Sequence, residues 1–266
     1  MPEIDVSLLL YGLSVGLGAG LIGGLLAGLA GVGGGLIYVP LFYAFMPDTD
    51  DSIAIHVFAS MVAIVITGFF STRAHWRLQH VDIPRLMLLL PGLIIGASLG
   101  LWSTLQLPQV WLLLGLAGLN GLVAYDYGST DSQRSKALSL PLFSGPIGYL
   151  SGILGIGGGT ILVPILRRHI PLRHAVGTSA ACGAIMAAAA VMLNLSVETI
   201  WLDILSEHFW FLAGLWLGIL LILPASTSWA AALHISLTDS TLRLILKITF
   251  SLLSLSLIAA AWIAAN

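Results

Sequence analysis

A glycine-rich motif occurs twice in this chain, each time inside a long apolar stretch, and it limits the folds open to the chain. The first copy, GLAGVGGGLIYVP, runs from Gly28 to Pro40, and the second, GILGIGGGTILVP, runs from Gly152 to Pro164. Each glycine costs a helix about 1 kcal/mol relative to alanine, so three in a row predict a break in the helix. Within a bilayer, irregular backbone persists only where protein or a polar cavity satisfies its N–H and C=O groups. The motif therefore predicts two breaks that serve either close packing or a binding site.

The stretches around the motif predict a protein that lies in a lipid bilayer. Hydrophobic residues make up 58% of the 266 positions and charged residues only 8%, whereas soluble domains carry about 25% charged residues. Several apolar runs approach the roughly 20 residues that a helix needs to span hydrocarbon, and the alternation of a membrane β-barrel is absent. The net charge of −2 offers no basic surface and predicts no nucleic-acid partner. The single cysteine, Cys182, excludes a disulfide within the chain.

Apolar runs between polar breaks predict an all-α polytopic membrane protein built from two repeats. The expected helical segments are 7–30, 36–45, 53–72, 86–105, 110–127, 138–154, 160–166, 175–195, 209–232 and 243–264. A polar stretch from Tyr127 to Ser139 divides the chain almost in half. We expect residues 1–127 to form the first repeat, 128–137 a cytoplasmic linker and 138–266 the second repeat. Each repeat then holds a glycine-broken helix or hairpin, followed by three transmembrane helices.

Charged loops predict how the repeats sit in the membrane. Arginine and lysine mark cytoplasmic loops; three arginines lie in each of the loops 73–85 and 167–173, whereas the acidic PDTDD at 47–51 has none nearby. Each glycine-broken segment then enters and leaves on one side, and the three spans that follow make the two repeats inverted. A straight broken helix, giving a parallel duplication, is the alternative. We expect a multi-pass location in the inner (cytoplasmic) membrane of the cell.

Tryptophans near the ends of the expected spans predict an aromatic belt at the membrane interface. The four tryptophans expected in this belt are Trp76, Trp111, Trp201 and Trp210.

The two glycine turns are predicted to line an anion site. Glycine permits positive φ, so consecutive N–H groups can converge on one anion at the positive end of the half-helix that follows. Turns that enter from opposite faces would meet near the midplane. The alternative is close helix packing, which we prefer for the glycines at four-residue spacing upstream: Gly16, Gly20, Gly24 and Gly28. A nucleotide-binding P-loop is excluded because no Gly-Lys-Ser/Thr follows either turn.

At these residues the chain resembles the TauE/SafE family of sulfite and organosulfonate exporters, over nearly its whole length. The resemblance is carried by the doubled Gly-x-Gly-Gly-Gly-x-x-x-x-Pro, by HVFASMVAIVITGFFSTRAHWRLQHVD and PGLIIGASLG in the first half, and by RHAVGTSAA in the second. It implies a secondary transporter of small anions, with the glycine turns as substrate region and export as the direction. One departure is FAS at 58–60, where the second half keeps GTS at 177–179. The departure leaves Ser60 as the only matching hydroxyl of the first half, so the substrate preference can differ from that of the usual members.

The predicted substrate-binding residues combine the glycine turns with hydroxyls in the neighbouring spans, which can donate hydrogen bonds without carrying charge. They are Gly31, Gly33, Gly34, Gly35, Ser60, Gly155, Gly157, Gly158, Gly159, Thr178 and Ser179. For the hydroxyls, the alternative is a hydrogen bond back to their own helix. His56 and His75 are candidates for proton coupling, because histidine titrates near physiological pH; structural histidines at the interface are the alternative.

Together these features predict a transporter rather than an enzyme. No nucleophile, base and oxyanion hole can be assembled from the sequence, and neither a cofactor nor a metal ion is expected. The predicted activity is secondary transport of a small sulfur-containing oxyanion by alternating access, with the anionic substrate and the lipid bilayer as partners. An anion channel of the same architecture and a membrane assembly factor are the alternatives. The sequence leaves the oligomeric state open, including a homo-oligomer.

Overall fold

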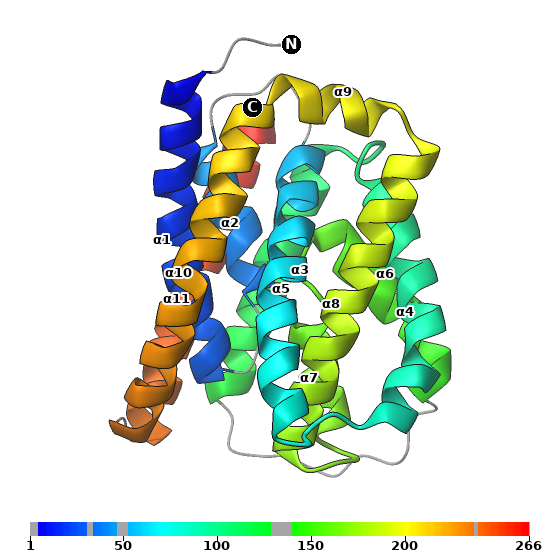
Figure 1. Cartoon of the computed structure of the whole chain (residues 1–266), viewed down its shortest axis with the longest axis vertical. Helices are drawn as coiled ribbons and strands as arrows, with labels where there is room; N and C mark the ends of the chain where they lie inside the picture. Colours follow the sequence, from blue (N-terminus) through cyan, green and yellow to red (C-terminus); the bar gives the residue numbers. More distant parts are fainter. Residues whose placement is uncertain (1–4, 31–33, 47–52, 129–139, 237–238, 266) are drawn as a thin grey trace.

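A computed structural model describes residues 5–30, 34–46, 53–128, 140–236 and 239–265, which form or connect α-helices throughout (Figure 1). The helices are α1 (Val6–Ala30), α2 (Gly35–Phe45), α3 (Ala54–Arg77), α4 (Ile83–Ser103), α5 (Gln109–Gly128), α6 (Leu140–Leu154), α7 (Gly159–Leu166), α8 (Leu172–Val197), α9 (Ile200–Glu207), α10 (Phe209–Ser236) and α11 (Asp239–Ala265). Within these residues, six helices are long and apolar enough to cross a membrane: α1, α3, α4, α8, α10 and α11. The predicted all-α polytopic fold is confirmed.

The helices agree with the expected segments except at α9. Helices α2 and α7 begin directly after the triple glycines, as predicted. The additional helix α9 lies between the expected segments 175–195 and 209–232. Trp201 and Ile204 are buried on one side of α9. Because the helix has only two turns, its amphipathic pattern is too short to be recognised in the sequence beside the long apolar runs. The expected linker 128–137 falls outside the described residues apart from Gly128, so the repeat boundaries stay a prediction.

Two helices begin at aspartates that cap them. The Asp5 carboxylate accepts the N–H groups of Ser7 and Leu8, each at 3.0 Å, together with the Ser7 hydroxyl. The hydrogen bond from the Ser7 hydroxyl, followed by those from the backbone, lowers the pKa of the Asp5 carboxyl from its ordinary value. Asp82 caps α4 by accepting the Arg85 N–H at 3.0 Å and also pairs with the Arg85 side chain. These caps fix the residues at which α1 and α4 begin.

Helix α1 packs along α10 through glycines. One face of α1 carries glycine at four-residue spacing: Gly12, Gly16, Gly20 and Gly24. A Cβ atom built on Gly16 would lie 2.1 Å from the carbonyl oxygen of Leu215, so only glycine lets the two backbones come this close. The contacts advance together along both helices, which therefore run parallel. The packing interpretation is confirmed at three of its glycines, whereas the surroundings of Gly28 lie outside the description.

Helices α4 and α6 pack in the same manner. A Cβ on Gly96 of α4 would lie 2.1 Å from the Gly145 carbonyl oxygen, and one on Gly152 of α6 would lie 2.2 Å from the Ala97 carbonyl oxygen. These contacts also advance together, so α4 and α6 run parallel. Each of the pairs α1–α10, α4–α6, α3–α8, α5–α11 and α2–α7 joins one helix of the first half to one of the second. The two halves are therefore interleaved rather than separate bodies.

Charged segments gather at opposite ends of the bundle. In the loop after α3, the Asp82 N–H donates to Thr178 Oγ1, near the start of α8, at 2.9 Å. This contact places the loops 73–85 and 167–173 at the same end of the bundle, which is called here the arginine-rich end. At the other, acidic end, the Trp102 indole N–H donates to Glu198 Oε1 at 3.0 Å. Helix α1 begins and α11 ends at the acidic end, where α9 also lies (Figure 1). The arginine-rich loops and Glu198 thus lie at opposite ends of the bundle. The acidic segment 47–51 lies outside the described residues, and the membrane side that each end faces stays a prediction.

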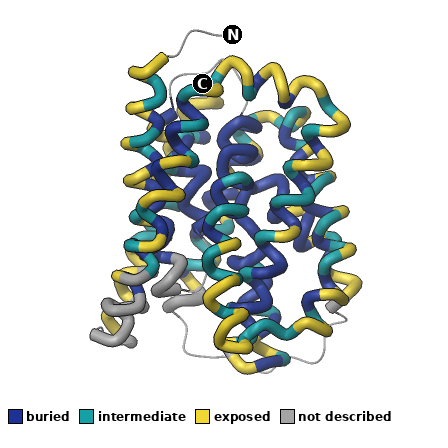
Figure 2. The backbone as a smooth tube through the Cα atoms, in the orientation of Figure 1, coloured by how far each residue is buried: buried dark blue, intermediate teal, exposed yellow. Residues whose placement is uncertain are grey.

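The interior surrounds the glycine turns. Residues 34–40, 53–61 and 151–160 are buried without interruption, and Figure 2 shows this part of the chain at the centre of the bundle. Trp201 belongs to this interior, because its ring stacks on Phe58 with centroids 4.9 Å apart. The belt prediction is therefore wrong for Trp201, which α9 turns inward. Trp111, by contrast, is 67% exposed, as an interfacial residue should be.

Candidate functional site

The second glycine turn joins α6 to α7 and is described in full. Gly155 and Gly157 adopt φ values of +62° and +55°, in the left-handed region that glycine alone enters freely. These two conformations redirect the chain, Gly158 then caps α7, and Gly159 begins it. The turn therefore requires glycine at positions 155 and 157 for its backbone shape.

The first glycine turn is described only in part. Gly31 and Gly33 lie outside the described residues, whereas Gly34 caps α2 and Gly35 begins it. A Cβ atom on Gly35 would lie 2.1 Å from the carbonyl oxygen of Ile156, so the two turns touch backbone to backbone. The start of α2 and the turn before α7 therefore meet in the interior, as the sequence predicts.

The second turn carries backbone N–H groups without a protein acceptor. In the part of the chain that the structure describes, the N–H groups of Gly157, Gly158, Gly159 and Thr160 donate no hydrogen bond, and no side chain caps α7. The first N–H groups of any helix lack an intrahelical acceptor and form the positive end of its dipole. Here, however, all four residues are buried. An unsatisfied N–H in hydrocarbon costs several kcal/mol, so a polar occupant is energetically favoured at this turn.

The predicted hydroxyls have three different surroundings. Ser60 of α3 donates to the Gly155 carbonyl at 2.6 Å and so ties the first half to the second turn. Thr178 accepts the Asp82 N–H at the arginine-rich end. Ser179 is buried, and its Oγ has no hydrogen-bond partner among the described residues. Of the three, Ser179 is the one whose hydroxyl is left for a ligand.

Helix α8 presents one face to the second turn. A Cβ built on Gly183 would lie 3.4 Å from the Gly158 nitrogen and 3.9 Å from the Gly159 nitrogen. Residues four apart share a helix face, so Ser179 lies on the same side of α8, one turn nearer the arginine-rich end. The unpaired hydroxyl and the unpaired amides therefore border the same strip of α8.

Two further polar groups at the turns were not predicted from the sequence. Thr160 follows Gly159 directly, and Tyr38 lies so close to Gly34 that a Cβ there would be 2.8 Å from the phenol oxygen. Both residues are buried. The Thr160 hydroxyl has no hydrogen-bond partner among the described residues, whereas the Tyr38 phenol lies within interaction range of the Thr67 side chain. The sequence feature that could have indicated them is their position, because each lies within one helical turn of a triple glycine. Buried hydroxyls without partners are unfavourable unless a ligand completes them.

The departure next to Ser60 changes local packing. Phe58 fills the position where the second half has Gly177, and its ring is covered by Trp201 of α9. At Gly177 there is no such room, because a Cβ would lie 2.5 Å from the His80 carbonyl oxygen. The matching motifs therefore support the bundle differently, through an aromatic stack in the first half and a backbone contact in the second.

The two histidines proposed for proton coupling lie far apart on α3. His56 is buried near the acidic end, with its ring centroid 5.4 Å from that of Tyr43. His75 is near the arginine-rich end, where its ring is 6.0 Å from His80, which in turn is 5.4 Å from His174. The structure does not bring the two candidates together, and their role in coupling stays a prediction.

The turn region is polar without being charged. The buried segments 34–40, 53–61 and 151–160 contain no Asp, Glu, Lys or Arg. Among the residues with described positions, no group of three or more His, Cys, Asp or Glu side chains is placed to hold a metal ion. Amides and hydroxyls without a fixed counter-charge can bind an anion and still release it, which a transport site requires.

Comparisons with known proteins identify the family of the chain. Residues 16–257 match the model of the sulfite exporter TauE/SafE family. The chain is similar to a probable membrane transporter protein of Haemophilus influenzae, with 30% identity over 169 residues, covering 59% of this chain and 64% of that protein. It is also similar to the probable membrane transporter protein YunE of Bacillus subtilis, with 26% identity over 181 residues, covering 57% of this chain and 66% of that protein. The chain thus spans just under two thirds of the length of these relatives. No solved structure matches it significantly.

Proposed function

The chain belongs to the sulfite exporter TauE/SafE family, and we propose that it is a secondary transporter of small sulfur-containing oxyanions such as sulfite or an organosulfonate. The names of both relatives, probable membrane transporter proteins, support transport. The substrate class and the export direction rest on the description of the family. The observation that carries the proposal is the set of unpaired, buried amides at the second glycine turn.

The proposed anion site lies on the α8 side of the second turn. The direct contact between Gly35 and Ile156 leaves no room between the turns themselves. The Gly158 and Gly159 amides face α8 at Gly183. Together with the amides of residues 157 and 160 and the hydroxyls of Thr160 and Ser179, they have no hydrogen-bond acceptor among the described residues. Several N–H groups at a helix N-terminus are a general arrangement for binding an oxyanion, and hydrogen bonds to a charged acceptor are about twice as strong as neutral ones.

The remaining predicted site residues take supporting roles in this proposal. Ser60 positions the second turn through the Gly155 carbonyl. Gly34 and Gly35 bring the positive end of α2 against the second turn, as the half-helices of transporters do around a substrate. Thr178 holds the loop before α4 at the arginine-rich end, one residue from Ser179.

We further propose that the halves are inverted repeats. Helix α6 runs parallel to α4, toward the acidic end, whereas α1 starts at the acidic end, where Tyr11 donates to the Phe45 carbonyl at 2.7 Å. Equivalent broken segments thus enter from opposite ends. Rocking of one inverted half against the other would open the site alternately to each side. The arginine-rich end would face the cytoplasm, in an inner membrane.

Flux of labelled sulfite into liposomes that contain only the purified chain tests the proposal. We expect saturable flux that unlabelled sulfite on the opposite side accelerates. Gly158→Val should abolish the flux while membrane insertion is retained, because a Cβ at Gly158 would lie 2.7 Å from Leu162 Cδ1 and so disturb the start of α7, where the unpaired amides lie. The matched control is Gly118→Val, since a Cβ at Gly118 has no neighbour within 4 Å.

The same measurement separates the alternatives. Flux that neither saturates nor responds to countertransport would indicate an anion channel. Absence of flux from a well-folded wild-type protein would contradict transport by this chain and favour an assembly role. Equal flux by Gly158→Val and wild type would remove the second turn from the site.

A further inference from the structure

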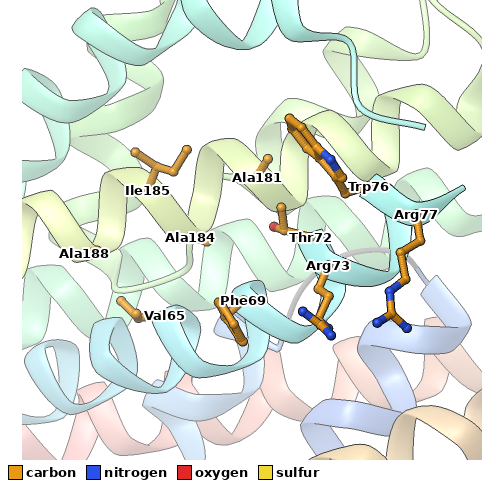
Figure 3. A pocket seen from close by; sticks show the side chains of 10 residues that line it. All are labelled: Val65, Phe69, Thr72, Arg73, Trp76, Arg77, Ala181, Ala184, Ile185 and Ala188. Atoms are coloured by element: carbon orange, nitrogen blue, oxygen red, sulfur yellow. The ribbon is translucent and has the colours of Figure 1, made fainter. Parts of the chain in front are cut away.

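A groove lies between α3 and α8 on the outside of the bundle (Figure 3). Its volume is about 540 Å³. Val65 and Phe69 of α3 and Ala184 and Ala188 of α8 form its apolar wall. The helices touch at Gly68, where a Cβ would lie 2.8 Å from Ala184 Cβ, and the small side chains of α8 leave the groove open beside this contact.

One end of the groove is polar and positively charged. Arg73 and Arg77 lie one helical turn apart, and both are exposed. Figure 3 shows them at the same end of the groove as Trp76. Neither arginine forms an ion pair with any residue that the structure describes. Thr72 Oγ1 also lines this end, buried and without a hydrogen-bond partner in the described bundle. The groove thus combines a long apolar wall with a cluster of unused donors.

We propose that this groove binds one anionic phospholipid, with the headgroup phosphate on Arg73 and Arg77 and an acyl chain along the apolar wall. Guanidinium groups bind phosphate oxygens through paired, charge-assisted hydrogen bonds. Basic pockets between transmembrane helices at the cytoplasmic side are known to hold anionic headgroups. The Thr72 hydroxyl supplies a further donor, and Trp76 sets this end at the level of the membrane interface.

The shape and charge of the groove favour a lipid over other occupants. Phe69 is 60% exposed and Ile185 is 41% exposed, so the apolar wall faces the region that acyl chains fill. A free anion would leave that wall unused. A second copy related by a two-fold axis along the membrane normal would place its own Arg73 and Arg77 at the same level as these, and the like charges would repel.

Lipid retention by the purified full-length chain tests the proposal. The chain is incubated in neutral detergent with equal amounts of phosphatidylglycerol and phosphatidylcholine that carry identical acyl chains, and bound lipid is counted by native mass spectrometry. We expect phosphatidylglycerol to be preferred roughly 25-fold, because each arginine near an anionic headgroup contributes about fivefold. The double variant Arg73→Gln/Arg77→Gln should lose this preference. The matched control, Arg168→Gln/Arg173→Gln, makes the same charge change at the same end outside the groove and should keep it.

A second variant tests the apolar wall separately. Ala188→Phe fills the apolar part of the groove and retains both arginines, so it should lower the retention of both lipids. This variant tests lipid binding in the groove even if the arginine variants fail to fold. Equal retention of the two lipids by the wild type would overturn the proposal, as would a control that loses the preference as fully as Arg73→Gln/Arg77→Gln. Displacement of phosphatidylglycerol by excess inorganic phosphate, or a lipid-free dimer, would also overturn it.

Discussion

Replacing Gly35 by alanine should separate the two glycine turns. The new Cβ would lie 2.1 Å from the carbonyl oxygen, 2.3 Å from the carbonyl carbon and 2.7 Å from the Cα of Ile156. All three are backbone atoms, so no side-chain rotation relieves the contact. The turns must move apart by about 0.9 Å before the closest approach reaches 3.0 Å, and overpacking of this kind costs about 1–3 kcal/mol.

The assay is thermal unfolding of the purified chain beside a control. Gly18→Ala is the control, because a Cβ at Gly18 on the exposed face of α1 meets nothing within 4 Å. At about 2–4 °C per kcal/mol for a chain of this size, Gly35→Ala should lower the Tm by roughly 2–12 °C. Gly18→Ala should leave the Tm unchanged or raise it, since alanine favours helix by about 1 kcal/mol. A Gly35→Ala protein that melts at or above the Gly18→Ala protein would refute the inferred contact between the turns.

Three further perturbations test other parts of the structure. Ser60→Ala removes the 2.6 Å hydrogen bond to the Gly155 carbonyl and should cost about 1 kcal/mol in the free energy of unfolding; no change in the denaturation midpoint would count against that bond. Gly155→Ala places a side chain on a residue with φ +62° and should lower the free energy of unfolding by about 1–2 kcal/mol. The control Gly145→Ala should leave stability unchanged, because a Cβ there meets nothing within 4 Å. Equal Tm values for the two variants would contradict the left-handed conformation of Gly155. In a Cys182→Ala background, the single cysteines of Arg168→Cys and Glu207→Cys should react with an impermeant thiol reagent from opposite sides of the membrane. Labelling of both from the same side would exclude the proposed orientation.

The sequence was sufficient for the parts of the fold that depend on local pattern. Long apolar runs gave the spanning helices, and the triple glycines located the starts of α2 and α7. The four-residue glycine spacing in α1 predicted a close-packed face, which α10 occupies. In each case a single segment carries the whole signal, because hydrophobicity and glycine spacing act within one helix.

The parts that depend on tertiary contact could not be predicted. That α9 folds inward is determined by the stacking of Trp201 on Phe58, which joins residues far apart in sequence. Ser60 and Ser179 belong to matching motifs, yet their hydroxyls differ. Ser60 donates a hydrogen bond to the Gly155 carbonyl, whereas Ser179 has no partner among the described residues. This difference depends on how α3 and α8 pack against the turns. The role of Thr160 could not be predicted from its place after the glycines, because only the structure shows that its hydroxyl is buried and has no partner among the described residues.

The central claim, that the second turn binds an anion through unpaired donors, is tested most directly by the sulfite affinity of Thr160→Val and Ser179→Ala, measured calorimetrically in detergent. Neither hydroxyl has a partner in the described part of the protein, so both variants should melt at the wild-type temperature or higher. Each should bind sulfite about tenfold more weakly, because a hydrogen bond to a charged acceptor contributes about 1.5 kcal/mol or more. Unchanged sulfite affinity in both well-folded variants would contradict the account.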